Sequence, residues 1–223
     1  MNKLAMFFTF ILLASTAFSQ KCLNAEADLQ WLRGYHLNKD SLYRSNKKEF
    51  EFIEIKKHDT IADIGSFNGY HPLVYSVFSD SCVFYLNDIQ QDGFAYYDSI
   101  KNVCEQIRGH SFTNKFSIVI GNDTNTKLPD HLFNIVLVRE ALHHFKMKDK
   151  MLMDIKRIMN PRKEARLILD EPIIGQTKKE NLCPGAMTRD DLLALLDKNG
   201  FSLSTEILVG DRSWFEFVLK EKK

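Results

Sequence analysis

The 223-residue chain lacks the patterns that mark several common classes of protein. Its four cysteines include no C-x-x-C pair, which argues against a zinc-ribbon or thioredoxin-like redox site. The lysines form only short pairs such as Lys47-Lys48, and the formal net charge is +1, so we expect no nucleic-acid partner. No low-complexity tract or Pro/Gly-rich linker divides the chain. The remaining composition, with 44% hydrophobic and 26% charged residues, is that of a globular protein long enough for one domain.

The N-terminal residues differ from the rest of the chain. Lys3 is followed by an apolar run over 4–14, and small residues then stand at Ala17 and Ser19, a pattern typical of a secretory signal peptide cut after Ser19. The apolar run is shorter than a typical membrane span. We therefore predict a signal peptide over 1–19 and a secreted or periplasmic protein. An uncleaved N-terminal anchor is the alternative, and only then do we expect a membrane partner.

Export would place the cysteines in an oxidising compartment, where one or two disulfides can form. The sequence does not determine their pairing among Cys22, Cys82, Cys104 and Cys183.

Strand and helix patterns alternate along most of the chain. Apolar runs predict seven strands, at 60–64, 82–87, 116–120, 133–138, 165–170, 203–209 and 214–219. Helical spacing lies between most of them, which favours an α/β doubly wound, Rossmann-like sheet with helices on both faces. Residues 20–58 look helical and charged, and we predict a lead-in that covers the sheet or caps a pocket. The main domain then spans 59–223.

A glycine loop connects the first strand to a helix that begins near Tyr70. It reads Asp63-Ile64-Gly65-Ser66-Phe67-Asn68-Gly69. Glycine lets a ligand approach the backbone closely, and a helix start offers free N–H groups. The second strand ends in Asp88, whose carboxylate can accept hydrogen bonds from both hydroxyls of a ribose. The dinucleotide motif G-x-G-x-x-G is absent, so a dehydrogenase is a distant alternative.

The ordered motifs resemble those of the class I S-adenosylmethionine-dependent methyltransferases. The glycine loop is similar to the family's D-x-G-x-G-x-G, with Phe67 in place of the middle glycine. Asp123 stands where the family often has the acid of G-D-x-x-x-L-P, and residues 139–145 resemble a segment that often ends in L-H-H. Asn134 is a departure, because the family usually has aspartate there, and the two glycines usual after Pro161 are missing.

The resemblance implies S-adenosylmethionine as cofactor and a role for ten residues in holding it. Asp88 would hold the ribose, Ile89 would pack on the adenine, and Arg139 would lie beside the methionine end. The loop residues that would cradle the methionine part are Asp63, Gly65, Ser66, Phe67 and Gly69, and those at the adenine edge are Asn122 and Asp123.

Methyl transfer needs positioning and exclusion of water more than a strong acid or base. A general base is needed only if the acceptor must lose a proton, and the candidates are Glu140, His143 and His144. A helix would put Glu140 and His144 on one face, but without a third ligand we predict no metal site. The structural alternative is that one histidine packs under the sheet and the other caps a helix.

Two functions follow from these patterns. The first is an exported methyltransferase that acts on a small-molecule or lipid-like acceptor. The alternative is a non-catalytic protein that binds a nucleoside or another ligand on a degenerate methyltransferase fold. Phe67, Asn134 and the export signal favour the alternative.

Overall fold

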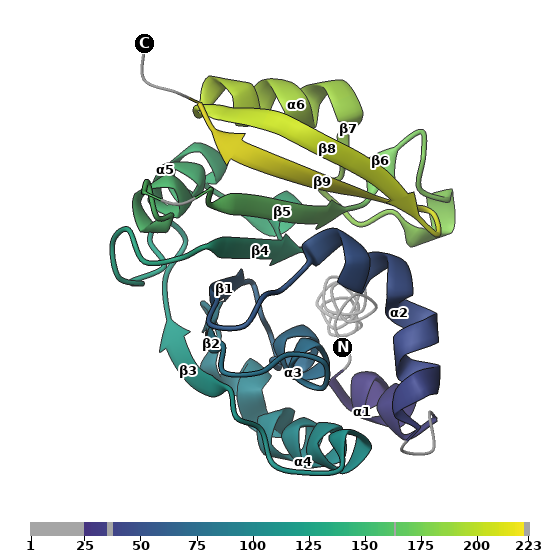
Figure 1. Cartoon of the computed structure of the whole chain (residues 1–223). Coiled ribbons are helices and arrows are strands. Elements are labelled where there is room, and N and C mark those ends of the chain that lie inside the picture. The colour runs from purple at the N-terminus through teal and green to yellow at the C-terminus, as the bar shows by residue number, and fades with distance from the viewer. Residues whose placement is uncertain (1–24, 35–37, 163, 221–223) are drawn as a thin grey trace, which may run out of the picture.

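The computed structural model of the chain describes residues 25–34, 38–162 and 164–220 (Figure 1). The predicted signal peptide and Cys22 lie outside the described residues. The main sheet has seven strands in the order β3-β2-β1-β4-β5-β9-β8. Its strands are β1 (Thr60–Ile64), β2 (Val83–Asp88), β3 (Lys115–Ile120), β4 (Ile135–Arg139), β5 (Arg166–Glu171), β8 (Phe201–Val209) and β9 (Arg212–Leu219).

The strand order creates a switch point between β1 and β4. Strands β1 to β5 run parallel, whereas β9 pairs antiparallel with both β5 and β8. From β1 the chain steps to β2 and β3 on one side, and then returns to β4 and β5 on the other. Open α/β sheets bind ligands outside the carboxyl ends of the strands at such a point. The loops that follow β1, β2 and β4 are therefore the place to look for a site.

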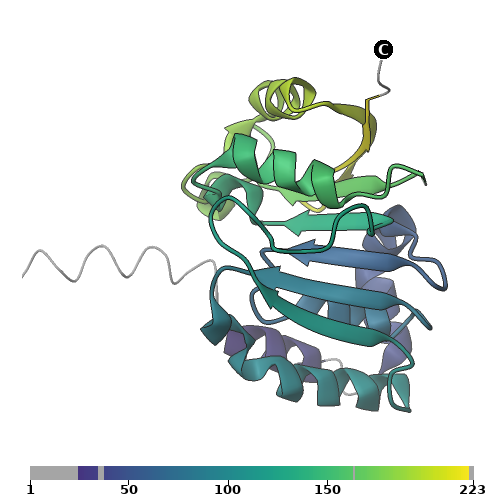
Figure 2. The ribbon, with the colours of Figure 1, turned by 90° about the vertical axis from the view of Figure 1, so that its left-hand side faces the viewer.

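Helices cover both faces of the sheet, as Figures 1 and 2 show. On one face lie α1 (Ala25–Gly34), α2 (Lys39–Ile53), α3 (Tyr70–Ser76) and α4 (Tyr97–Arg108); on the other lie α5 (Lys148–Ile158) and α6 (Arg189–Lys198). The short elements are the 3-10 turns η1 (Gln91–Tyr96), η2 (Leu142–His144) and η3 (Lys179–Asn181), and the two-stranded pair β6 (Ile173–Ile174) and β7 (Met187–Thr188).

The central strand β4 explains why both faces need a cover. Ile135 and Leu137 pack on the side of α2 and α3, whereas Val136 and Val138 pack on the side of α5 and α6. All four side chains are buried. A continuous apolar run is typical of a parallel strand buried on both faces.

The predicted fold class and the seven predicted strands are confirmed, with ends that differ by one or two residues. Two local features differ from the sequence prediction. Residues 140–145 form only the short turn η2 and no α-helix, and the pair β6–β7 was not predicted. Within the described ranges, no helix is both long and apolar enough to cross a membrane. Cys82, Cys104 and Cys183 form no disulfide with one another.

Candidate cofactor site

The glycine loop and the end of β2 form one hydrogen-bonded unit. The backbone amide of Gly65 donates to the carbonyl of Asn87 at 2.9 Å. The Asp88 carboxylate accepts from the Phe67 amide at 2.9 Å through Oδ2, and from the Gln90 amide at 2.9 Å through Oδ1. Each carboxylate oxygen has two lone pairs, so Asp88 keeps the capacity to accept from the two hydroxyls of a ribose.

Both loop glycines have little room for a side chain. Gly65 has a φ of +77°, and a Cβ there would lie 2.4 Å from the Cβ of Ala141. Gly69 has a φ of +75°, and a Cβ there would lie 2.4 Å from the Leu86 side chain. The loop is therefore packed between β2 and the segment that follows β4, and glycine is required at both positions.

Asp63, at the end of β1, is a buried acid with a perturbed pKa. Its exposed fraction is 3%, and burial raises the pKa of its carboxyl group to about 6. The hydroxyl of Ser66, also buried, interacts with the Asp63 carboxylate and has no other hydrogen-bond partner among the described residues. Asn68 in the same loop donates to Asp28 of α1 at 2.8 Å, which ties the lead-in helix to the loop. A buried carboxylate whose neighbour is a single hydroxyl fits a ligand that carries positive charge and hydrogen-bonding groups.

Ile89 and Phe67 border the loop on the β2 side. Ile89, directly after Asp88, is 48% exposed, and a large apolar side chain at that point can pack on the face of a base. Phe67 adopts a φ of +50°, and its ring lies against Gly93 of η1, where an added Cβ would come within 3.0 Å of it. The Phe67 ring is thus directed toward η1, and its amide remains part of the Asp88 hydrogen-bond pattern.

Asn122 and Asp123 lie in a tight turn after β3. The backbone amide of Asn122 donates to the carbonyl of Asn125 at 2.9 Å, and its side chain accepts from the Thr124 amide at 2.9 Å. Asp123 lies 3.5 Å from the ammonium group of Lys146. The Asn122 amide is therefore used within the turn, whereas among the described residues the Asp123 carboxylate contacts only Lys146, at the long distance of 3.5 Å. Their roles at the adenine edge stay predictions.

Arg139 forms the centre of a buried ion network. Its guanidinium donates to Glu49 of α2 at 2.6 Å and to Asp170 of β5 at 2.9 Å. Arg212 of β9 binds the other oxygen of Asp170 at 2.7 Å and pairs with Glu140 at 2.8 Å. Although burial alone would lower it, the Glu49 and Asp170 carboxylates hold the pKa of Arg139 well above its ordinary value. Through Glu49, α2 is anchored over the carboxyl ends of β4 and β5 (Figure 1).

The three candidate bases do not form the arrangement that a helix would give. Glu140 has a φ of +50° and faces Arg212, so the expectation that it shares a helix face with His144 is wrong. His143 is buried, and its Nδ1 lies 2.6 Å from Glu171. His144 is exposed, its ring centroid is 4.0 Å from that of His143, and burial of part of its ring lowers its pKa. His144 is thus the accessible base of the three.

Asn134 does not weaken the site. Its side chain accepts from the Thr60 amide at 3.1 Å, where β1 begins. This contact lies at the amino ends of the strands, opposite the glycine loop. The substitution of the family's aspartate is therefore a change in strand anchoring, not in ligand binding.

Glu49 and Glu171 are buried acids that the sequence analysis missed. Glu49 lies in a charged helical segment, and the sequence pattern there does not distinguish a buried acid from exposed ones. Glu171 had a usable signal, because it follows Asp170 at the end of a predicted strand, where acids often serve a site.

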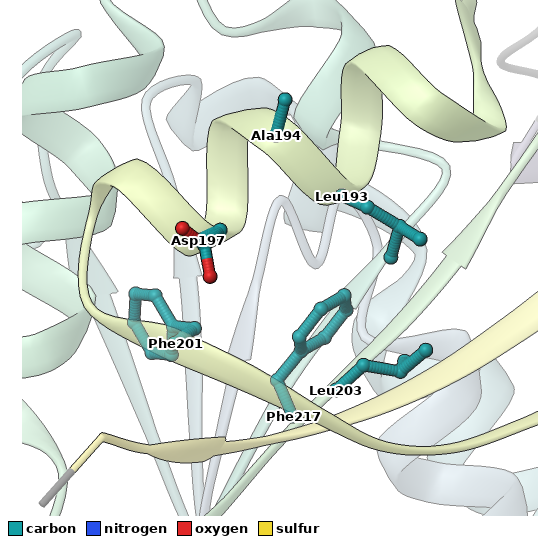
Figure 3. A pocket seen from close by; sticks show the side chains of 6 residues that line it. All are labelled: Leu193, Ala194, Asp197, Phe201, Leu203 and Phe217. Atoms are coloured by element: carbon teal, nitrogen blue, oxygen red, sulfur yellow. The ribbon is translucent and has the colours of Figure 1, made fainter.

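A hollow of about 370 Å³ lies away from the glycine loop (Figure 3). It opens between α6 and the β8–β9 pair, near the amino end of β5. Its lining side chains are Leu193, Ala194, Asp197, Phe201, Leu203 and Phe217. This largely apolar hollow has no part in the site described above.

Comparison with known proteins agrees with this architecture. A family model described as a methyltransferase domain matches residues 83–165. A SAM-dependent methyltransferase from Aquifex aeolicus is similar in structure, with a TM-score of 0.62 and 16% identity over 78% of this chain and 88% of that chain. The putative methyltransferase in a complex with the Haloferax volcanii Trm112 activator gives a TM-score of 0.63 and 11% identity over 89% and 96% of the two chains.

The fold is also shared with a protein of different chemistry. The [4+2]-cyclase SpnF is similar with a TM-score of 0.57 and 13% identity, over 82% of this chain and 79% of that chain. No curated protein matches this sequence. At these identities the structural likeness defines the fold, and the reaction must be argued from the site.

The sheet order and the structural likeness show the fold of the class I methyltransferases, and a methyltransferase-domain model matches residues 83–165 of the chain. The similar protein from Aquifex aeolicus is dependent on SAM, which is S-adenosylmethionine. The residues present fit that molecule, because Asp88 retains acceptor capacity for a ribose, and the buried Asp63 carboxylate beside Ser66 can face a positively charged group.

Proposed function

We propose that this protein is an S-adenosylmethionine-dependent methyltransferase that acts on a small-molecule or lipid-like acceptor. The observation that carries the proposal is the Asp88 carboxylate, held by two backbone amides directly beside the glycine loop. That arrangement presents an oriented acceptor where a ribose would lie. The pattern of residues 1–19 further supports an exported protein that works as a secreted or periplasmic enzyme.

The other loop residues have separate roles in this proposal. Asp63 and Ser66, with the glycines at 65 and 69, would hold the methionine part, and Ile89 would pack on the adenine. Asp123 would bind the adenine edge through its carboxylate. Arg139 is held by Glu49 and Asp170, so it would act by positioning α2 and setting the local charge.

Bound S-adenosylmethionine supplies an electrophilic methyl group on a sulfonium sulfur. The protein's main task is then to align the acceptor and exclude water. The helix α2 is held at the carboxyl end of β4 by the bond between Glu49 and Arg139, where it would help to exclude water. For an acceptor that must lose a proton, His144 is the exposed group that can take it, because its lowered pKa keeps the imidazole neutral near pH 7.

One observation favours the non-catalytic alternative. The network of Glu49, Arg139 and Asp170 fills the carboxyl ends of β4 and β5 on the α2 side. An acceptor would have to bind beside this network or displace α2. A protein that bound only a nucleoside would need no such space.

Transfer of a labelled methyl group distinguishes the two functions. The purified protein is incubated with methyl-labelled S-adenosylmethionine and either aqueous or lipid extracts of cells. We expect label in a product of one fraction, lost in Asp88→Ala and retained in Asp98→Ala, an exposed acid in the first turn of α4. Cofactor binding without label in either fraction would instead support the binding protein.

A further inference from the structure

Three potential metal ligands meet beside the turn that follows β4. One ligand atom each from His143, His144 and Cys183 lies within 4.8 Å of the other two. The histidines are neighbours in η2, whereas Cys183 comes from the connection between η3 and β7. That connection packs tightly here, because a Cβ added at Gly185 would lie 2.5 Å from the carbonyl oxygen of His143.

The second observation is an unpartnered nitrogen on a buried ring. His143 is 4% exposed, and its Nδ1 lies 2.6 Å from Glu171 Oε2. A carboxylate only accepts hydrogen bonds, so Nδ1 donates to Glu171, and in the neutral imidazole Nε2 then presents its lone pair. Nε2 is buried and has no hydrogen-bond partner among the described residues. A buried acceptor without a partner loses the hydrogen bonds it would make with water, so it calls for a ligand.

Glu171 holds His143 in the manner of an outer-sphere carboxylate. Its Oε1 accepts from the amides of Ala141 at 3.1 Å and Leu142 at 2.8 Å, which fixes the turn as well as the ring. Metal-bound histidines usually donate their second N–H to such a group. Glu171 therefore fixes both the turn and the orientation of the His143 ring.

We infer that His143, His144 and Cys183 form a zinc site. Two imidazole nitrogens and a thiolate are a ligand set that Zn²⁺ accepts, and binding would release the thiol proton to water. Tetrahedral zinc places such ligand atoms roughly 3.3 to 3.6 Å apart, so the exposed His144 and the loop residue Cys183 would move inward by roughly an ångström. Three protein ligands leave a fourth position for water or for an anionic atom of an acceptor.

Lys148 lies near the proposed zinc site, but its ammonium group is bound to backbone carbonyls. The ammonium group of Lys148 donates to the carbonyls of His143 at 3.2 Å and Phe145 at 3.0 Å.

Ala141, which packs against Gly65, precedes His143 by two residues, so the zinc site adjoins the cofactor loop. The inference concerns metal binding alone and holds whether or not methyl transfer is found. With zinc bound, the lone pair of His144 is donated to the metal, so His144 can serve as a base only in the zinc-free protein.

The test is a zinc titration of the untagged full chain after treatment with a chelator, in competition with a chromogenic zinc indicator. We expect one equivalent of Zn²⁺ per chain. His144→Ala and Cys183→Ser should each weaken that binding at least about tenfold to a hundredfold. His110→Ala, an exposed histidine outside the cluster, is the matched control and should bind as the wild type does.

Cobalt gives a second readout that depends on the thiolate. Co²⁺ added to the wild type should produce a thiolate-to-metal charge-transfer band, which Cys183→Ser should lack. Circular dichroism of each variant shows that it is folded. Failure of the wild type to bind zinc, or binding that both variants retain in full, would overturn the inference.

Discussion

At the scale of single residues, burial of the ionised Asp63 carboxylate lowers the free energy of unfolding of the protein. Its carboxyl group is buried, and burial raises its pKa to about 6 from an ordinary value of 3.8. A group with a raised acid pKa binds its proton more tightly in the folded state. The free energy of unfolding therefore falls as the pH rises from about 4 to about 6, and this contribution is constant above that window. A shift of about two units corresponds to roughly 3 kcal/mol.

Asp63→Asn should remove this cost, because an amide has no charge to bury. We expect the variant to be more stable than the wild type at pH 8 by roughly 2 to 3 kcal/mol, with the difference vanishing near pH 4. Urea unfolding at several pH values measures it. Asp98→Asn, at an exposed position, is the control. Parallel pH profiles for the wild type and Asp63→Asn would contradict this explanation.

At the scale of elements, the glycine loop and the segment after β4 form one packed unit. The sequence predicted the loop because strand, glycine and helix patterns are local. It did not predict that Gly65 lies against Ala141, or that residues 139–145 form a short turn, because both depend on packing between distant segments. The contact between Arg139 and Glu49 joins residues that are 90 positions apart, and the sequence did not predict it for the same reason.

Gly65→Ala tests that packing. The added Cβ would meet the Ala141 Cβ at 2.4 Å, so we expect the backbone strain of a positive φ plus an overpacking cost of roughly 1 to 3 kcal/mol. Gly210→Ala is the matched control, because Gly210 has a φ of +66° and an added Cβ would meet nothing within 4 Å. Its stability should fall only by the backbone strain, roughly 1 to 2 kcal/mol. Thermal or urea unfolding compares them. Equal losses in the two variants would show that the contact with Ala141 has no energetic weight.

At the scale of the whole molecule, one buried network joins both halves of the chain. Asp170 lies between Arg139 and Arg212, and Glu49 extends the network to α2. The sequence predicted the strands that carry these residues, because apolar runs and strand ends are visible locally. It could not predict which charges meet, because that depends on the sheet order.

Asp170→Asn should destabilise the protein by roughly 3 to 5 kcal/mol, because it leaves the buried guanidinium of Arg139 and the half-buried one of Arg212 without their shared carboxylate. Urea unfolding gives the change in free energy. Glu51→Gln, in the exposed Lys47–Glu51 pair, should leave stability unchanged within error. A loss in Asp170→Asn no larger than in that control would mean that the network does not hold α2 in place.

The measurement that tests the central claim most directly is calorimetric titration of S-adenosylmethionine and its demethylated product into the protein. Asp88→Ala removes the carboxylate beside the glycine loop, and Asp98→Ala removes an exposed one nearby. We predict micromolar binding by the wild type and Asp98→Ala, and at least a tenfold loss in Asp88→Ala. Absence of binding by the wild type, or binding unchanged in Asp88→Ala, would contradict the assignment of this cofactor site.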